Sequence, residues 1–106
     1  MTEAVIMKKI QIAVSKLGAR LFRNNTGMVR QQDGRVIRFG LAVGSADLIG
    51  FTPVNGVAVF TAIEVKHKGK PTKQQEAFLE MVREFGGIAG VAHSIEEALE
   101  IIRGDK

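Results

Sequence analysis

The hydrophobic residues of this 106-residue chain follow two different spacings, which alternate along the sequence. Val5, Ile6, Ile10, Val14 and Leu17 recur every three or four positions, as in a helix that packs on one side. Elsewhere, short apolar runs lie between Gly, Asn and Asp residues, a pattern typical of strands. The pattern predicts helices over 3–17, 72–85 and 95–103, and strands over 20–23, 28–32, 35–39, 47–52, 57–66 and 88–93. We therefore expect an α/β protein with a mixed central sheet flanked by helices.

Two strand segments are more specific than the rest. Asp33-Gly34 is a favoured two-residue turn, so 28–32 and 35–39 should form a hairpin. The run over 57–66 is nearly continuous in apolar residues, which predicts a buried central strand. A turn over 53–56 should connect this strand to the one before it.

The later helices carry recognisable start signals. Thr72 with Gln75 has the spacing of a capping box, and so does Ser94 with Glu97. The helix over 72–85 would carry the chain across the sheet to a strand parallel to a neighbouring one.

Composition limits the class of protein. A length of 106 residues predicts one domain, residues 1–106, and 45% hydrophobic with 25% charged residues is typical of a globular protein. The chain has no cysteine, which excludes disulfides and thiolate metal sites, and two histidines make a structural zinc site a poor expectation. No apolar stretch approaches the ~20 residues of a membrane span, and the N-terminus does not resemble a secretory signal. We expect a cytoplasmic protein with no membrane partner.

The charge is unevenly distributed. Residues 1–75 hold twelve Lys/Arg against four Asp/Glu, and residues 76–106 hold three against seven, so that +8 and −4 give the net charge of +4. A basic body favours a polyanionic partner, whereas the alternative is a solvated surface with a chance imbalance. The only aromatic residues are six phenylalanines. Nucleic acid would therefore be contacted mainly through its backbone.

Candidate chemistry lies at the ends of two neighbouring strands. Asp47 begins one strand, and Glu64 and Lys66 lie on one face of the next because side chains alternate along a strand. Asp47, Glu64 and the backbone carbonyl of Val65 would ligate Mg²⁺ or Mn²⁺, which prefer oxygen. Lys66 would hold the attacking water and stabilise charge on the phosphorane during metal-assisted phosphodiester hydrolysis. The alternative is a cross-strand ion pair at a sheet edge.

Glycine and small residues surround Asp47. Gly44, Ser45 and Gly50 would leave room for a DNA backbone to approach the metal. Ordinary turn chemistry explains the same residues equally well.

Basic residues form a second group. Phosphate contacts would come from Arg23, Arg30, Arg35, Arg38, Lys68, Lys70 and Lys73. His67 lies among the lysines, and a lone loop histidine is more often a bystander than a proton carrier. The hairpin that carries three of the arginines is alternatively a dimerisation arm, because a single hairpin is marginally stable alone.

Several short motifs together resemble one family. They are Gly44-Ser45-Ala46-Asp47-Leu48-Ile49-Gly50, Ile63-Glu64-Val65-Lys66, Gly69 with Thr72 and Gln75, and, earlier, Glu3, Arg23-Asn24-Asn25 and Gly27. In this order they resemble the VRR-Nuc family of the PD-(D/E)xK nuclease superfamily, over nearly the whole chain. The match is to the short stand-alone members found in phages and bacteria.

The resemblance implies a restriction-endonuclease-like fold with an αβββαβ core, to which this chain adds a hairpin in its N-terminal half. It implies metal-dependent cleavage of structured DNA, with four-way (Holliday) junctions as the substrate and a homodimer as the active form. By this resemblance Asp47 and Glu64 match the metal ligands and Lys66 the catalytic lysine. Ala46 departs from the proline of the superfamily name, at a position that shapes the turn.

Two more residues take roles from the resemblance alone. Glu3 matches an acidic residue of the first helix that approaches the metal directly or through water; alternatively it is a favourable charge at a helix N-terminus. Gln75 matches a glutamine that orients the lysine or a phosphate, a role compatible with its capping box.

The sequence leaves several functions open. The first is a structure-selective endonuclease, and the second is a nicking, flap or non-specific duplex nuclease. A DNA-binding module that has lost catalysis is the rival from another class, and a small structural protein is the last. An intact Asp47, Glu64 and Lys66 favour an enzyme over the DNA-binding module. A small structural protein would leave the charge asymmetry and the residues around Asp47 unexplained.

Overall fold

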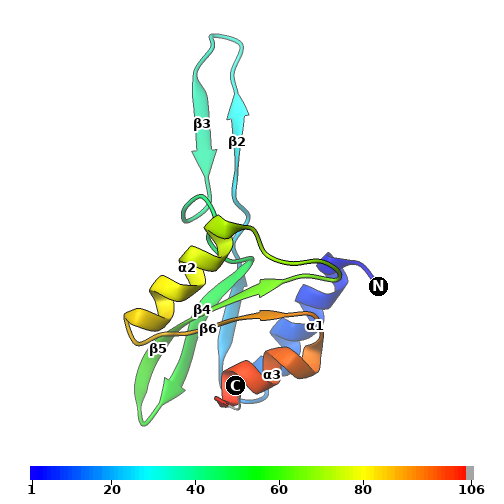
Figure 1. Cartoon of the computed structure of the whole chain (residues 1–106), viewed down its shortest axis with the longest axis vertical. Helices are drawn as coiled ribbons and strands as arrows, with labels where there is room; N and C mark the ends of the chain where they lie inside the picture. Colours follow the sequence, from blue (N-terminus) through cyan, green and yellow to red (C-terminus); the bar gives the residue numbers. More distant parts are fainter. Residues whose placement is uncertain (105–106) are drawn as a thin grey trace.

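The computed structural model describes residues 1–104 and contains each of the predicted helices and strands (Figure 1). In chain order these are α1 (Glu3–Ser15), β1 (Arg20–Arg23), β2 (Gly27–Arg30), β3 (Val36–Phe39), β4 (Leu48–Val54), β5 (Val57–Val65), α2 (Lys73–Glu84), β6 (Ile88–Ala92) and α3 (Ile95–Arg103). Their ends differ from the prediction by at most two residues, and those of β1 and α3 match it. Within the described residues, no helix combines the length and apolar character that crossing a membrane requires.

Four strands form the main sheet, in the order β1-β4-β5-β6. Strands β1, β4 and β5 pair antiparallel, while β6 pairs parallel to β5. The crossover helix that the sequence predicts is α2, which joins the two parallel strands. The turn between β4 and β5 is shorter than predicted: only Asn55 and Gly56 lie outside the strands, both with positive φ (51° and 79°). This geometry suits a two-residue hairpin turn, and asparagine and glycine tolerate it best.

Helices cover both faces of the sheet. On one face, Ile6, Ile10 and Val14 of α1 and Ile101 of α3 pack with apolar side chains of all four strands. On the other face, Leu79 and Val82 of α2 pack on a smaller cluster that includes Ala46 and Ala62. Helices α1 and α3 lie side by side (Figure 1). The main sheet is thus the middle of three layers.

Strand β5 is buried over only part of its length, so the prediction of a buried strand over 57–66 is wrong for its first half. Residues Thr61–Val65 are buried, whereas Val57 and Phe60 are exposed by 62% and 42%. The reason is that β6 pairs with β5 only from Thr61 onward. The uncovered half of β5 faces the C-terminal half of α2.

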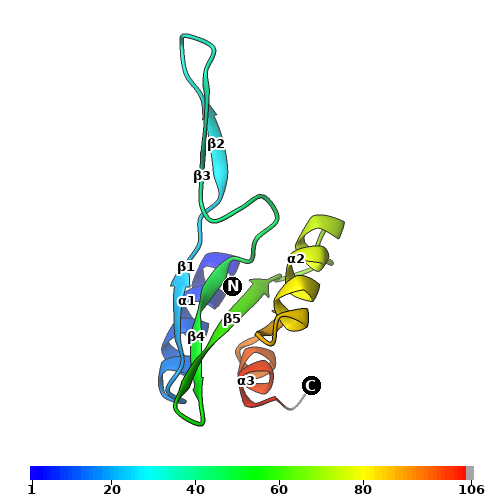
Figure 2. The ribbon, with the colours of Figure 1, turned by 90° about the vertical axis from the view of Figure 1, so that its left-hand side faces the viewer.

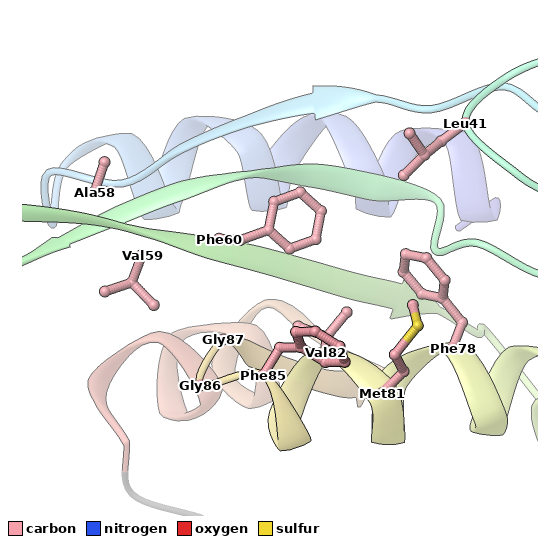
Figure 3. A pocket seen from close by; sticks show the side chains of 10 residues that line it. All are labelled: Leu41, Ala58, Val59, Phe60, Phe78, Met81, Val82, Phe85, Gly86 and Gly87. Atoms are coloured by element: carbon pink, nitrogen blue, oxygen red, sulfur yellow. The ribbon is translucent and has the colours of Figure 1, made fainter.

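An apolar groove of about 540 Å³ lies between these two segments. Figure 3 shows Phe78 and Met81 of α2 and its C-cap Phe85 around the groove, with Phe60 of β5 and Leu41 of the loop before β4. Phe85 is 88% exposed. Neither Asp47, Glu64 nor Lys66 lines this groove.

The hairpin of β2 and β3 forms a separate two-stranded sheet that extends away from the three layers (Figures 1 and 2). Val29 pairs with Ile37 and Gly27 with Phe39, so these apolar side chains share one face. Arg38 pairs with Met28, and Arg30 with Val36, on the opposite face. The hairpin therefore has one apolar face and one face on which two arginines lie beside Met28 and Val36.

Gly50 has a packing role, contrary to the expectation that it leaves room for DNA. A Cβ at this position would lie 1.9 Å from the backbone oxygen of Arg20 on the neighbouring strand β1. Ser45 is likewise buried, and its hydroxyl bonds to Asn24 and Ala42. Gly44 has a φ of +81° and lies against Gln74. The explanation from turns and packing accounts for all three residues.

Candidate active site

Asp47 and Glu64 lie opposite each other at one end of the main sheet. The antiparallel register pairs Leu48 with Ile63, so the residue before Leu48 faces the residue after Ile63. The Asp47 carboxylate is fixed in place because its Oδ2 accepts a hydrogen bond of 2.9 Å from the backbone N–H of Val65. The sheet register thus brings two carboxylates together from residues 17 positions apart.

Glu64 is buried to an unusual degree for a carboxylate. Only 1% of the residue is exposed, and its Oε1 has no hydrogen-bond partner. The pKa of Glu64 is raised from 4.5 to about 7, first by burial and then by the negative charge of Asp47 and hydrogen bonding with it, while the positive charge of Lys66 opposes the shift. A buried carboxylate oxygen that lacks a partner is costly when ionised, unless a cation compensates it.

Lys66 lies directly after β5, on the same side as Glu64. Its Nζ is 3.6 Å from Glu64 Oε2, and its side chain is 20% exposed. The prediction that both side chains share a face is confirmed. This distance is long for a charge-assisted hydrogen bond. Lys66 therefore compensates one oxygen of Glu64 loosely and can still turn toward a ligand.

The other predicted ligands lie around this pair. Glu3, in the first turn of α1, reaches the same end of the sheet, where its Oε2 accepts a hydrogen bond of 3.1 Å from His67 N–H. Among residues 1–104, no group of three or more His, Cys, Asp or Glu side chains is arranged to hold a metal ion. The carboxylates placed together are thus those of Asp47 and Glu64, and the carbonyl of Val65 lies between Glu64 and Lys66 in the chain.

Gln75 forms the capping box predicted for it. Its backbone N–H donates to Thr72 Oγ1 at 3.2 Å, and its side-chain Oε1 accepts from Thr72 N–H at 2.8 Å. The side-chain N–H₂ group is the part of Gln75 that this box does not use.

All seven predicted DNA-binding residues are exposed, and they occupy three regions. Arg23 ends β1, Arg30, Arg35 and Arg38 lie on the hairpin, and Lys68, Lys70 and Lys73 lie between β5 and the first turn of α2. Arg35 is paired with Asp33 at 2.7 Å, and Arg23 donates to Asn25 at 3.3 Å. The lysines follow Lys66 directly and are the basic group nearest to the carboxylates in the chain.

His93 is a residue of this region that the sequence interpretation missed. It follows β6, beside Lys66, whose N–H donates to Ala92 O at 3.0 Å. The His93 ring contacts Glu97 of α3 on one side and the backbone oxygen of Gly69 on the other. The available signal is the spacing of four residues between His93 and Glu97, whereas the sequence pattern assigns His93 to the end of a strand and pairs Glu97 with Ser94.

The comparisons with known proteins agree with this geometry. The model of the VRR-NUC domain matches residues 3–96, whereas no curated protein and no solved structure matches the chain. Without the hairpin, the order α1, β1, β4, β5, α2, β6 is the αβββαβ arrangement expected of a PD-(D/E)xK core. The chain therefore belongs to the VRR-NUC domain family: it is a nuclease with a restriction-endonuclease-like fold, and its substrate is DNA.

Proposed function

We propose that this protein is a Mg²⁺- or Mn²⁺-dependent endonuclease that cleaves branched DNA, with four-way junctions as its substrate. The observation that carries the metal dependence is the buried Glu64 beside Asp47, with Oε1 unpartnered. Mg²⁺ is commonly bound by one or two carboxylates, with water and substrate phosphate as the remaining ligands. Two oxygen-donor side chains at a strand end fit that requirement.

The residues of the chain divide the work of hydrolysis. Asp47, Glu64 and the Val65 carbonyl would hold the metal, and the Val65 N–H keeps Asp47 in position for it. A bound metal lowers the pKa of water and polarises the phosphoryl oxygen. Lys66 Nζ would hold the attacking water and stabilise the extra negative charge as the phosphorus–oxygen ester bond breaks.

Glu3 and Gln75 take supporting roles in this proposal. Glu3 would act on the metal directly or through a bound water, because His67 N–H uses only its Oε2 and leaves its other oxygen as a further acceptor. Gln75 would offer its side-chain N–H₂ group to Lys66 or to a phosphate while its oxygen caps α2.

Exposed basic residues would bind the DNA backbone on either side of the site. Lys68, Lys70 and Lys73 would contact phosphates near the cleaved bond, while Arg23 and the hairpin arginines would contact a more distant part of the DNA. Such contacts are largely independent of sequence and depend strongly on salt. A structure-selective enzyme needs this type of recognition, because branch points differ in sequence.

Junction cleavage in this proposal is carried out by two copies of the chain. The hairpin makes few contacts outside itself, and Val29, Ile37 and Phe39 are each about half exposed on its apolar face. Contact with a second copy would cover such a face, while Arg30 and Arg38 on the opposite face stay available to DNA. The hairpin thereby serves in both roles that the sequence leaves open.

The test is a cleavage assay on an end-labelled synthetic four-way junction beside a linear duplex of the same sequence. Each is incubated with Mg²⁺, Mn²⁺ or EDTA, and Lys66→Ala is the control. Metal-dependent cuts in the junction alone, absent in the variant, are the expected result. Equal cutting of both substrates would show a duplex nuclease, and binding without cleavage would show a DNA-binding module.

A further inference from the structure

The His93 ring bridges two parts of the protein that are distant in sequence. Its Nδ1 is 2.9 Å from Glu97 Oε1, and its Nε2 is 3.3 Å from the backbone oxygen of Gly69. The same Glu97 oxygen also accepts a hydrogen bond of 2.6 Å from the His93 backbone N–H. Both ring nitrogens thus face oxygen acceptors, and an imidazolium ring donates to both of them.

The start of α3 does not require the contact with Gly69. Ser94 is the N-cap of this helix, and its side chain accepts a hydrogen bond of 3.2 Å from Glu97 N–H. The bond from the His93 backbone to Glu97 adds to this cap without the ring. The bond from the ring to Gly69 therefore serves to hold the loop 67–71 and not the start of α3.

Three hydrogen bonds hold this loop and the residue before it. Lys66 N–H donates to Ala92 O at 3.0 Å, His67 N–H donates to Glu3 Oε2 at 3.1 Å, and Gly69 O is bound by His93. Lys68 and Lys70 flank Gly69 on either side and are exposed. Gly69 has a φ of +87°. Glycine adopts positive and negative φ about equally readily, so its own backbone does not fix the conformation of the loop. Without the third anchor, the two lysines would lie on a loop fixed only at its first residues.

We propose that His93, oriented by Glu97, is a positioning residue for the nuclease reaction. It fixes Gly69 so that Lys68 and Lys70 meet the phosphates of the strand that enters the site at Lys66. The inference rests on the proposed function for the role of the lysines, while the anchoring of the loop stands on its own contacts. A fixed loop binds DNA more tightly because less conformational entropy is lost on binding.

The test separates anchoring from DNA binding. His93→Leu removes both ring bonds, and His93→Gln keeps a donor that can reach Gly69. Glu96→Gln is the matched control, since Glu96 lies in the same turn of α3 and is exposed. Backbone ¹⁵N relaxation of Lys68, Gly69 and Lys70 reports loop order, and junction affinity in EDTA reports binding. Thermal unfolding of each variant checks the fold, and His93→Ala, which also lacks both ring bonds, replaces His93→Leu if the latter unfolds.

His93→Leu should lower the order parameters of the loop and weaken junction binding by about three- to tenfold, the effect of one lost hydrogen bond. In the cleavage assay KM should rise by a similar factor, with kcat changed less than about twofold. His93→Gln should recover most of the affinity. In a Lys68→Ala/Lys70→Ala background, His93→Leu should have almost no further effect, because it acts through those lysines.

Three results would overturn the proposal. Unchanged loop order in His93→Leu would show that the ring does not anchor Gly69. A looser loop with unchanged affinity, or an equal loss of affinity in the double-lysine background, would show that His93 does not act through the lysines. If the wild-type protein binds no DNA, the proposed function fails instead, and the relaxation data still decide whether the loop is anchored.

Discussion

Replacing Glu64 by Gln should remove a loss of stability that the wild-type protein shows as the pH rises, and it should also remove the activity. The Glu64 carboxyl has a pKa of about 7 in the folded protein and about 4.5 when unfolded. Below about pH 4.5 the carboxyl group is protonated in both states, so its ionisation does not lower the free energy of unfolding. Between the two values the folded state binds a proton that the unfolded state has lost, so stability falls as the pH rises. Above about pH 7 the full cost of ionising Glu64 is present.

The size of this cost follows from the two pKa values. Their difference corresponds to a free energy of unfolding of about 3 kcal/mol, since one pH unit is worth about 1.4 kcal/mol. Glutamine has the same shape and no charge, so it should not show the loss. Its amide brings its own cost if it lacks a partner, but that cost does not change with pH. The quantity to measure is therefore the change in the stability difference between the two proteins, not its sign at one pH.

The assay is urea unfolding of both proteins in EDTA at about pH 5 and about pH 8.5. The stability of Glu64→Gln relative to wild type should rise by about 2–3 kcal/mol between these conditions. Glu84→Gln, an exposed carboxylate on α2, is the control and should show no such rise. A stability difference that is the same at both pH values would refute the argument that ionised Glu64 is destabilising.

Four further outcomes are expected. Mn²⁺ at millimolar concentration should raise the melting temperature of the wild type, because a ligand that binds only the folded state stabilises it. Asp47→Ala should abolish this shift, and a shift that survives in the variant would place the metal elsewhere. Lys66→Ala should abolish cleavage in the junction assay and leave junction binding in EDTA within about twofold, whereas joint loss of binding and fold would make Lys66 structural. Neutralising Lys68 and Lys70 should weaken binding to every DNA sequence and flatten its dependence on salt; a loss confined to one sequence would contradict backbone recognition. Gly50→Ala should destabilise the protein by at least about 2 kcal/mol in urea unfolding, because its Cβ would overlap the Arg20 backbone oxygen, and an unchanged midpoint would refute this packing role.

Much of the fold was predictable because its elements carry strong local signals. The spacing of apolar residues in α1, the capping box at Thr72 and the Asp33-Gly34 signal of a hairpin each depend on residues a few positions apart. The hairpin loop is longer than the predicted two-residue turn, since 31–35 lie outside β2 and β3 and Gly34 N–H donates to Gln31 O. The site carboxylates were predictable for a related reason, since Asp47 and Glu64 lie at the ends of strands that are consecutive in the main sheet. Strands that follow each other in the sequence are also neighbours in the sheet at this point, so the sequence pattern alone places the two carboxylates together.

Other features depend on contacts that the local pattern does not contain. The first half of β5 is as apolar as the second, but it is exposed because β6 has only five residues and pairs with the second half alone. Gly50 lies inside a predicted strand, where its lack of a side chain was expected to leave room for DNA, and only the approach of β1 shows its packing role. The bond between His93 and Gly69 joins residues 24 positions apart. In each case the decisive neighbour comes from another part of the chain.

The arrangement at Glu64 also bears on the alternative that its pair with Lys66 is a simple ion pair. A stabilising ion pair at a sheet edge would be exposed on both sides, or buried with both carboxylate oxygens bonded. Here the lysine is 3.6 Å from one oxygen, the other oxygen is buried without a partner, and the nearest carboxyl group, that of Asp47, repels the charge. The unpartnered oxygen and the negative charge of Asp47 both cost stability when Glu64 is ionised, and both would favour binding of a cation between the two carboxylates. The same pH-dependent cost that Glu64→Gln should relieve is thus the cost that a divalent metal would offset in the active enzyme.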